Sequence, residues 1–501
     1  MRFLAYLRGL QGRRRLAAAA ILGAISALAL PPLHVLPALL IAFPGLLALL
    51  DGAGWRRAFW TGCCFAIGHH VVGLYWITEA ILFDAAHFWW LVPVAVPFLS
   101  MVLAPFIGIP CALAVRCKAP LPRALVLAGA WTLASLAQQF TATGFPWNVF
   151  GSVWGIPGPV GDLLIQPASL IGVHGLTLLT ILLACTPAIG RGAMTGAAAV
   201  LAIWAGFGAW RLEQKQAAPI GLTVVLVQGN VAQGQKHDRS FAIDMFNRHL
   251  VLTQEGVAAA GGKPTLVIWP ETASPFLVAS DDAAREAIAE AASGPAMVGS
   301  LRIDENRQYR NSLIAVYGPG PAAAIYDKWH LVPFGEYIPD WTPVPLKLLP
   351  GAGLAKGKGP STIRMTGIPP AGALICYEAI FPGYVIDAAD RPDWMVNITN
   401  DAWFGNSSGP RQHLAAVRMR AVEEGLPVMR AANTGISAGF DANGRELGRL
   451  GMNEQGVLLI GLPAPLPPTP FARFGLDIPL GLSVAVLILG IGLSRREGSS
   501  E

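Results

Sequence analysis

Apolar residues gather in long runs at both ends of the chain. Runs long enough to cross about 30 Å of hydrocarbon as helices lie at 15–31, 34–51, 57–78, 88–115, 121–139, 163–188, 193–211 and 476–493. The fourth run contains several prolines, so we expect this helix to be kinked or tilted. The fifth run is the weakest of the eight and also fits an interfacial helix. The pattern predicts a bundle of eight membrane-spanning helices.

The region between the seventh and eighth runs has ordinary polarity and a different pattern. Short β-branched runs lie at 221–229, 265–270, 296–301, 311–318, 372–376, 394–399 and 457–462. Helical patterns separate several of them, as at 239–260 and 409–425. Strands that alternate with helices indicate a layered α/β domain. We therefore expect three parts: helices one to seven in 1–212, an α/β domain in 213–470, and the last helix with its tail in 471–501.

Composition supports the membrane assignment. Hydrophobic residues make up 53% of the 501 residues and charged residues 13%, whereas soluble domains are about 25% charged. The formal net charge is only +5. Loop arginines and lysines explain this small excess better than nucleic-acid binding, for which a basic patch on a soluble face is needed.

Basic residues occupy alternate loops, and this predicts the topology. The loops after the first, third and fifth runs contain no Lys or Arg, whereas basic residues flank the others. Loops rich in Lys and Arg stay in the cytoplasm, so both termini should be cytoplasmic and 213–470 should lie on the far side. No small-residue cleavage site precedes a polar sequence, so we expect the basic start not to be a cleaved signal peptide. The basic residues are Arg2, Arg8, Arg13, Arg14, Arg15, Arg56, Arg57, Arg116, Lys118, Arg123, Arg191, Arg495 and Arg496.

One cysteine stands apart from the other five. Cys376, in "LICYEAIFP", lies in the polar region, while the others lie in apolar runs or, for Cys117, directly after one. A thiol in an oxidising compartment usually has a disulfide partner, and Cys376 has none in its domain. It is therefore either buried and inert or a nucleophile. Its position at a strand end, directly before Tyr377 and Glu378, favours a crevice and hence the nucleophile. The chain has no C-x-x-C pair, and nothing in it indicates a zinc site.

A nucleophilic thiol needs a base and a group that stabilises an oxyanion. Glu271 follows a strand in "LVIWPETASP", where an apolar setting would raise its pKa; the alternative is a solvated loop acid. Lys328 lies among aromatic residues in "YDKWHLVPFGEYIP". Burial of its ammonium would require a carboxylate such as Glu336; the alternative is a surface charge.

Histidines are the other candidate bases. His237, His330 and His413 lie near predicted strand ends, and none has an orienting partner evident in the sequence.

The order Glu271, Lys328, Cys376 resembles the nitrilase superfamily, whose catalytic set is Glu, Lys and Cys. Such a domain between the seventh and eighth of eight spans resembles the apolipoprotein N-acyltransferases of the bacterial inner membrane. The resemblance covers nearly the whole chain and rests on "TGFPWN" (143–148), "VQGNVAQ" (227–233), "WPET" (269–272), "KWHLVPFGEYIP" (328–339), "CYE" (376–378), "ITNDAWFG" (398–405) and "RAANTGISAGFDANG" (430–444).

The resemblance implies the fold and the site. It implies an inserted nitrilase-like αββα sandwich, here facing the periplasm. Glu271 would be the general base, Lys328 the oxyanion stabiliser and Cys376 the nucleophile. Glu336 would orient Lys328, while Tyr377 and Glu378 would shape the pocket. His237 stands where the family usually has tryptophan.

The resemblance also implies the reaction. An acyl chain would pass from a phospholipid donor, through a Cys376 thioester, to the α-amino group of a diacylglyceryl-cysteine on an apolipoprotein. No metal, cofactor or nucleic acid would take part, and we expect a monomer in the membrane. The sequence leaves the substrate-binding residues unknown.

Two alternatives stay open. A membrane-anchored nitrilase-type amidase or hydrolase would share the triad but use water as acceptor. A transporter with a regulatory soluble domain is less favoured, because the chain shows no internal repeat and its charges cluster at the ends of the spans.

Overall fold

The computed structural model describes residues 2–83, 85–214, 217–232, 234, 239–318, 320–341 and 353–498. The chain divides into two compact units, Met1–Glu213 with Phe474–Glu501 and Gln214–Arg473. The first unit is helical and the second mixed α/β. His237 lies outside the described residues.

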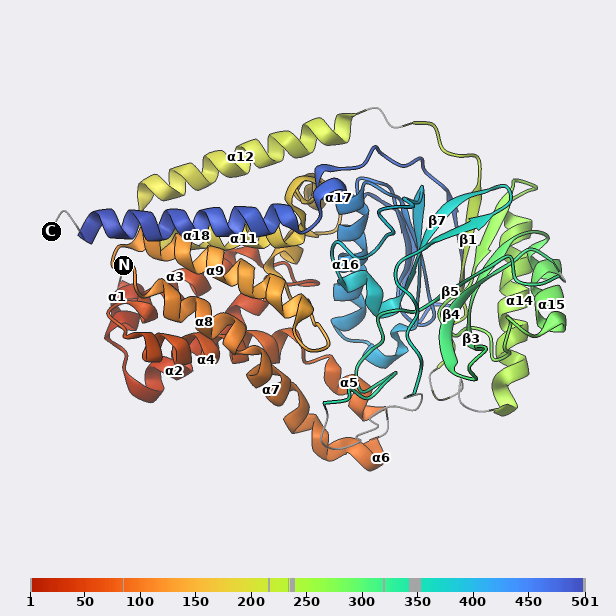
Figure 1. Ribbon diagram of the computed structural model, residues 1–501, viewed down its shortest axis with the longest axis horizontal. Coiled ribbons are helices and arrows are strands. Elements are labelled where there is room, and N and C mark those ends of the chain that lie inside the picture. The colour runs from red at the N-terminus through yellow and green to blue at the C-terminus, as the bar shows by residue number, and fades with distance from the viewer. Residues whose placement is uncertain are drawn as a thin grey trace. The chain divides into compact units, whose positions relative to one another are not determined.

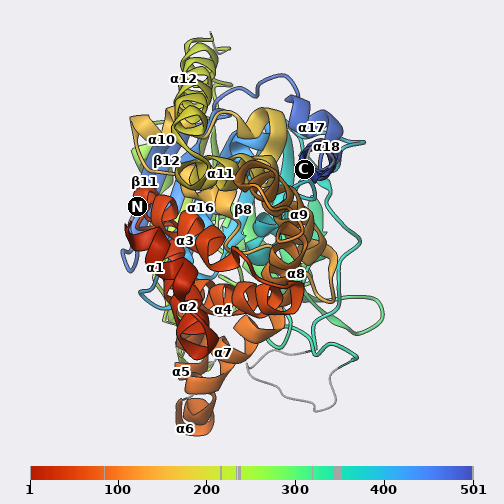
Figure 2. The same cartoon turned by 90° about the vertical axis from the view of Figure 1, so that its left-hand side faces the viewer.

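The first unit is a bundle of apolar helices. Within it α2 packs on α4, α4 on α8, and α9 on both α8 and α18 (Figures 1 and 2). Small residues permit close approach, as in many membrane bundles: a Cβ on Gly68 of α4 would lie 1.9 Å from the Ala20 carbonyl oxygen of α2. The helices are α1 (Arg2–Gly9), α2 (Gly12–Ala27), η1 (Leu36–Ala38), α3 (Leu39–Leu50), α4 (Trp55–Gly73), α5 (Ile77–Leu82), α6 (Ala85–Phe88), η2 (Trp89–Leu91), α7 (Val92–Leu103), α8 (Pro105–Ala114), α9 (Pro120–Phe140), η3 (Phe150–Trp154), α10 (Pro159–Leu164), α11 (Ala168–Ile189), α12 (Arg191–Glu213) and α18 (Asp477–Gly498).

In the described part of the chain, five helical segments are long and apolar enough to cross a membrane. They are Ala85–Ala114, Pro120–Phe140, Ala168–Ile189, Arg191–Glu213 and Asp477–Arg496. They match five of the eight predicted runs, including the weak fifth. The prediction that this is a membrane protein with apolar helices is therefore confirmed.

The predicted count of eight spans is not confirmed. Helices also occupy the first three predicted positions, but α2 has 16 residues and α3 has 12, whereas a span needs about 20. The third, α4, carries two arginines and two histidines. The predicted break in the fourth run is present, because α7 ends at Leu103 and α8 begins at Pro105, and proline cannot donate the helical hydrogen bond.

The second unit contains two six-stranded sheets. Their strand orders are β12-β1-β2-β3-β4-β5 and β11-β10-β9-β8-β7-β6. In each sheet three central strands are parallel, β1-β2-β3 and β7-β8-β9, and the flanking pairs are antiparallel. The strands are β1 (Thr223–Gln228), β2 (Thr265–Ile268), β3 (Ala296–Ile303), β4 (Tyr309–Val316), β5 (Ala324–Asp327), β6 (Thr362–Met365), β7 (Ile368–Ile375), β8 (Trp394–Thr399), β9 (Val428–Ala432), β10 (Ser437–Phe440), β11 (Glu446–Leu450) and β12 (Gly456–Gly461).

The sheets face each other, and helices cover their outer faces (Figure 1). Alternate side chains of one strand enter different cores: Leu226 lies in the core between the sheets, and Val225 lies in the core beneath α14 and α15. In the second sheet Val396 faces the first sheet, and Met395 packs with α16. The unit is thus an αββα sandwich, as predicted. Its helices are η4 (Arg239–Phe241), α14 (Ala242–Ala259), α15 (Asp282–Ala292), η5 (Cys376–Ile380), η6 (Asp401–Phe404), α16 (Gly409–Glu424) and α17 (Pro470–Phe474).

Local sequence signals set the ends of the covering helices. The Asp281 side chain accepts a hydrogen bond of 3.0 Å from the Ala284 N–H and caps α15. Helix α16 begins with Pro410 in its first turn and ends at Gly425, whose φ of 68° is in the left-handed region. Helix α16 is thereby held against the second sheet with His413 inside.

A close contact ties β3 to the segment that follows β2. A Cβ on Gly299 would lie 2.1 Å from the Pro270 carbonyl oxygen and 2.7 Å from the Glu271 Cα. Gly299→Ala should therefore lower the free energy of unfolding by about 1–3 kcal/mol, the usual cost of overpacking. The measurement is the midpoint of thermal unfolding of the purified protein in detergent.

Gly461→Ala is the matched control. Gly461 is also a strand residue, and a Cβ there would have no heavy atom within 4 Å. Equal unfolding midpoints for the two variants would contradict the predicted clash.

Candidate active site

Three predicted side chains follow three strands of the sandwich. Glu271 comes shortly after β2, Lys328 directly after β5, and Cys376 directly after β7. All three are buried, with exposed fractions of 5%, 1% and 7%. A crevice beyond the strand ends is where α/β folds place reactive groups.

The Lys328 ammonium lies between two carboxylates. Its Nζ is 3.1 Å from Glu271 Oε1 and 2.9 Å from Glu336 Oε1. The Val332 N–H donates to Glu336 Oε2 at 2.8 Å and so orients the second carboxylate. The structure therefore brings Glu271, Lys328 and Glu336 together.

Two asparagines complete this network. Asn311 Nδ2 donates to Glu271 Oε1 at 2.7 Å and to Glu336 Oε1 at 3.1 Å. The Asn400 N–H donates to Glu271 Oε2 at 2.8 Å. The sequence analysis assigned neither residue to the site. The sequence feature that could have indicated them is an asparagine at the end of an apolar strand. Asn311 begins "NSLIAVYG", and Asn400 follows "WMVNIT".

The pKa of Glu271 is lowered, whereas the sequence led us to expect a raised pKa. Burial raises this pKa, as the sequence argument held, but the Lys328 charge and the hydrogen bonds from Asn311, Lys328 and Asn400 outweigh burial and lower it. Burial lowers the pKa of Lys328, but the charges of Glu271 and Glu336 raise it well above its usual value. Both groups are therefore ionised at neutral pH.

Cys376 occupies a strained turn between β7 and η5. Its φ is 51°, in the left-handed region that residues other than glycine rarely adopt, and such a conformation costs about 1–3 kcal/mol. Burial and the Glu271 charge raise the pKa of the thiol, and Lys328 opposes this only in part. The thiol is therefore protonated at rest.

Glu378 connects this turn to the Lys328 segment. Its Oε2 accepts from the Ile375 N–H at 2.6 Å and from the Tyr326 hydroxyl at 2.9 Å. Its Oε1 accepts from the Trp329 N–H at 2.7 Å. Burial raises the pKa of Glu378 to about 7, although these hydrogen bonds oppose the rise. The side chain is fully buried, so its structural effect is to fix two backbone segments relative to each other.

Aromatic rings flank the turn. The His330 ring stacks on Phe381 with centroids 3.7 Å apart and meets Tyr377 edge-on at 5.6 Å. The Trp329 ring lies 4.9 Å from that of His330. These rings give the region around Cys376 an apolar border.

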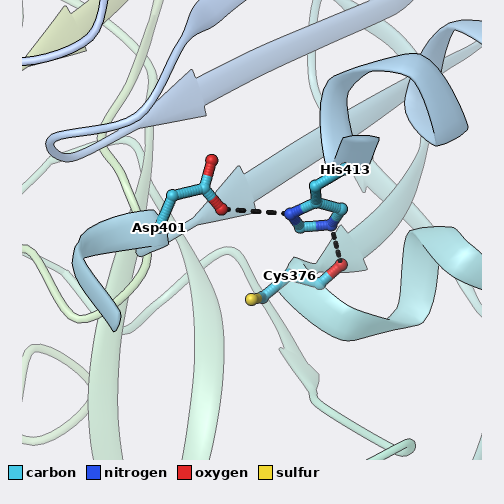
Figure 3. Close-up of side chains that lie close together, drawn as sticks. All are labelled: Cys376, Asp401 and His413. Carbon is cyan, nitrogen blue, oxygen red and sulfur yellow. Dashed lines mark hydrogen bonds and ion pairs between the residues drawn. The ribbon is translucent and has the colours of Figure 1, made fainter. Parts of the chain in front are cut away.

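His413 has a partner that the sequence did not reveal. Its Nδ1 lies 3.0 Å from Asp401 Oδ1, and its Nε2 lies 3.0 Å from the Cys376 carbonyl oxygen (Figure 3). The sequence showed no evident orienting partner for His413, and the structure places Asp401 beside it. Asp401 begins η6 after β8, and the fold alone brings it to the α16 histidine.

Cys376, Asp401 and His413 also have the ligand types of a metal site. Their ligand atoms lie within 4.8 Å of one another. However, Arg430 Nη2 lies 2.6 Å from Asp401 Oδ2 and 3.3 Å from His413 Nδ1. A guanidinium in contact with two of three ligands opposes a metal ion electrostatically. The arrangement fits a hydrogen-bond network and does not fit a metal site.

Comparisons with known proteins define the class first. Residues 224–465 match the carbon-nitrogen hydrolase family, and residues 22–186 match the apolipoprotein N-acyltransferase N-terminal domain. A solved amidase from Nesterenkonia sp. is 19% identical over 50% of this chain and 92% of that chain, with a TM-score of 0.36. By the two family matches alone, the chain contains a carbon-nitrogen hydrolase domain and a membrane domain of the N-acyltransferase type.

Full-length relatives define the family. An apolipoprotein N-acyltransferase of Bradyrhizobium diazoefficiens is 40% identical over 97% of this chain and 96% of its own length. That of Rhodopseudomonas palustris is 38% identical over 98% of this chain and 97% of its own length. The chain belongs to the apolipoprotein N-acyltransferase family and is an acyltransferase.

Proposed function

We propose that this enzyme transfers a fatty acyl chain from a phospholipid to the α-amino group of a diacylglyceryl-cysteine at the N-terminus of an apolipoprotein. The observation that carries the proposal is the buried ammonium of Lys328 between Glu271 and Glu336, near enough to Cys376 for the charges of Glu271 and Lys328 to act on its thiol. Family membership supports the lipoprotein acceptor, and the apolar border around Cys376 suits a lipid donor. The aromatic residues of that border, Trp329, His330, Tyr377 and Phe381, are proposed to contact the acyl chain.

In the first half-reaction Glu271 takes the proton of the Cys376 thiol while Sγ attacks the ester carbonyl carbon of the phospholipid. The carbonyl π electrons move to its oxygen. Lys328 has three N–H donors; two bind the carboxylates, and the third is proposed to bind this oxyanion together with the Tyr377 N–H. The C–O bond then breaks, Glu271 returns its proton to the departing alkoxide, and lysophospholipid leaves behind a thioester.

In the second half-reaction the lipoprotein amine attacks the thioester carbon. Glu271 accepts a proton from the amine nitrogen, and the same donors hold the new oxyanion. The C–S bond breaks, the sulfur regains a proton from Glu271, and an amide leaves. Every bond change balances within the two substrates and the side chains, so no metal or cofactor takes part in these steps.

The proposed domain assignments follow from the apolar runs and the polar region between the seventh and eighth of them. We place helices one to seven in 1–212, the catalytic domain in 213–470 and the last helix in 471–501, with the catalytic domain in the periplasm. This location is supported by the alternation of Lys and Arg between loops. One protomer contains the whole proposed site, so we expect the monomer to be active.

The alternatives predict different outcomes. A hydrolase would use water to cleave the same thioester and release fatty acid. The transporter hypothesis receives no support from the family membership. The first prediction below separates transfer from hydrolysis.

The first prediction concerns the thioester. Incubation with phospholipid and no amine acceptor should build up an acyl adduct on Cys376, measured by mass spectrometry of the intact protein. Cys376→Ala should lose both the adduct and transfer to a diacylated peptide. Glu271→Gln should keep the thiol but acylate far more slowly, because no base accepts its proton.

The same protein samples provide the control and the outcomes that would contradict the thioester prediction. Cys376→Ala is nearly isosteric and should insert and unfold like the parent. Acyl transfer by Cys376→Ala would show that the nucleophile lies elsewhere. Release of fatty acid without any transfer to the peptide would favour the hydrolase.

The second prediction concerns Lys328. Lys328→Met should lower the acylation rate about 10²-fold or more, because a preorganised oxyanion donor is lost. It should also move the pH profile of acylation to higher pH: without the ammonium the pKa of Glu271 rises, and Glu271 must be deprotonated to act. The measurement is single-turnover adduct formation as a function of pH.

Two further variants serve as comparisons for Lys328→Met. Lys328→Arg should rescue poorly, because a planar fork does not replace a compact donor. Glu336→Gln should show a smaller defect than Lys328→Met, since it misplaces the ammonium but keeps it. Near-parental acylation by Lys328→Met would rule out the proposed role.

The third prediction concerns topology. Reporter fusions near residue 230 should give a periplasmic signal, and fusions at the C-terminus a cytoplasmic one. A cytoplasmic signal from the fusion near residue 230 would overturn the proposed location of the catalytic domain.

A further inference from the structure

His413 donates a hydrogen bond to the backbone of the nucleophile. Its Nε2 lies 3.0 Å from the Cys376 carbonyl oxygen, and its ring is completely buried. A carbonyl oxygen only accepts hydrogen bonds, so Nε2 carries the hydrogen. The residue is on α16, a different element from the turn that it contacts.

The imidazole is held in place from its other side. With the hydrogen on Nε2, Nδ1 of the neutral ring accepts from Arg430 Nη2 at 3.3 Å. Asp401 Oδ1 lies 3.0 Å from Nδ1 and accepts a hydrogen bond from it only when the ring carries a second hydrogen. Asp401 in turn accepts from the Thr399 hydroxyl at 3.0 Å and from Arg430 Nη2 at 2.6 Å. Asp401, Thr399 and Arg430 are all buried, so the ring has one orientation.

The carbonyl that His413 binds belongs to the peptide between Cys376 and Tyr377. A trans peptide is planar, and its C=O and N–H point in opposite directions. Fixing the carbonyl therefore fixes the direction of the Tyr377 N–H. In Figure 3 the Cys376 sulfur points away from the imidazole, while the carbonyl oxygen points toward it. The N–H is therefore directed away from His413, toward the side of the thiol.

We propose that His413 is a positioning residue that aims the Tyr377 N–H at the oxyanion formed during acyl transfer. The proposal rests on the proposed function above. The hydrogen bond also polarises the peptide group and so strengthens its N–H as a donor. It further holds Cys376 in its left-handed conformation. We assign the base role to Glu271 and not to the imidazole, because the Nε2 hydrogen of His413 is engaged with the Cys376 carbonyl oxygen.

Two reactions of the same thiol separate this role from a general structural one. Acylation by phospholipid passes through an oxyanion, whereas alkylation by iodoacetamide displaces iodide and forms none. Both are measured on the full-length protein in detergent, as the rate at which Cys376 gains each adduct by mass spectrometry. Loss of an aimed oxyanion donor should slow only the first reaction.

Glutamine and methionine form a matched pair at position 413. They have similar length and volume, and the glutamine amide nitrogen can take the place of Nε2. His413→Met should lower the acylation rate about tenfold or more. This loss is smaller than the roughly 10²–10³-fold loss in rate that follows complete removal of an oxyanion donor, because the Tyr377 N–H is still present. Alkylation should stay within about threefold, and His413→Gln should recover most of the acylation. If His413→Met does not fold, His413→Asn replaces it, because its shorter amide cannot reach the carbonyl.

The outcomes are distinct. Absence of any acyl adduct on the parent enzyme would refute the proposed function itself. An adduct on the parent with equal acylation by His413→Met and the parent would overturn the role of His413 alone. Equal losses of acylation and alkylation would also overturn it, since His413 would then act on the thiol or the fold and not on the oxyanion donor.

Discussion

The site depends on one buried ammonium. Lys328 is 1% exposed, and its charge is tolerated only because Glu271 and Glu336 lie within 3.1 Å. Removing one partner from a buried ion pair typically costs about 3–5 kcal/mol, so the three groups are stable only together. They come from the ends of β2 and β5 and from the segment after β5, and Asn311 of β4 joins both carboxylates. The electrostatics of one cation thus fixes three parts of the chain relative to one another.

Hydrogen bonds hold the turn around Cys376. Its left-handed φ is unfavourable, and two buried groups hold the neighbouring backbone: Glu378 accepts from the Ile375 N–H, and His413 donates to the Cys376 carbonyl. Glu378 also accepts from the Trp329 N–H, next to Lys328. The carboxylate therefore ties the proposed nucleophile to the cation without touching either reacting atom.

The resemblance to the nitrilase superfamily implied the αββα sandwich. Sequence patterns predicted a layered α/β domain, because its central strands are buried on both faces and so form continuous apolar runs. They did not reveal β5, β6, β9, β10 and β11, which have four or five residues each and lack a β-branched run. The candidate site was predictable where a reactive residue type followed an apolar β-branched run, as with Glu271 and Cys376. Asn311, Asn400 and Asp401 were missed, and His413 was named only as a candidate base, because the role of each lies in its partners and the fold alone brings the partners together. The lowered pKa of Glu271 was missed for the same reason. The apolar residues beside Glu271 in the sequence indicate burial, but Lys328, whose charge lowers the pKa, is 57 positions away in the chain.

The pKa values of the two proposed reacting groups constrain the order of events. The pKa of Glu271 is lowered and that of Cys376 is raised, so carboxylate and thiol coexist at rest. A protonated thiol resists oxidation, because the thiolate is the reactive species; this suits an unpaired cysteine in the proposed periplasmic location. Proton transfer must then accompany attack on the acyl ester. When the proton moves from the thiol to Glu271, the carboxylate loses its negative charge, and a negative charge forms on the oxyanion. Since both charges are proposed to lie beside the Lys328 ammonium, the cation that stabilises the resting carboxylate becomes the cation that stabilises the transition state, and the buried site keeps the same net charge throughout.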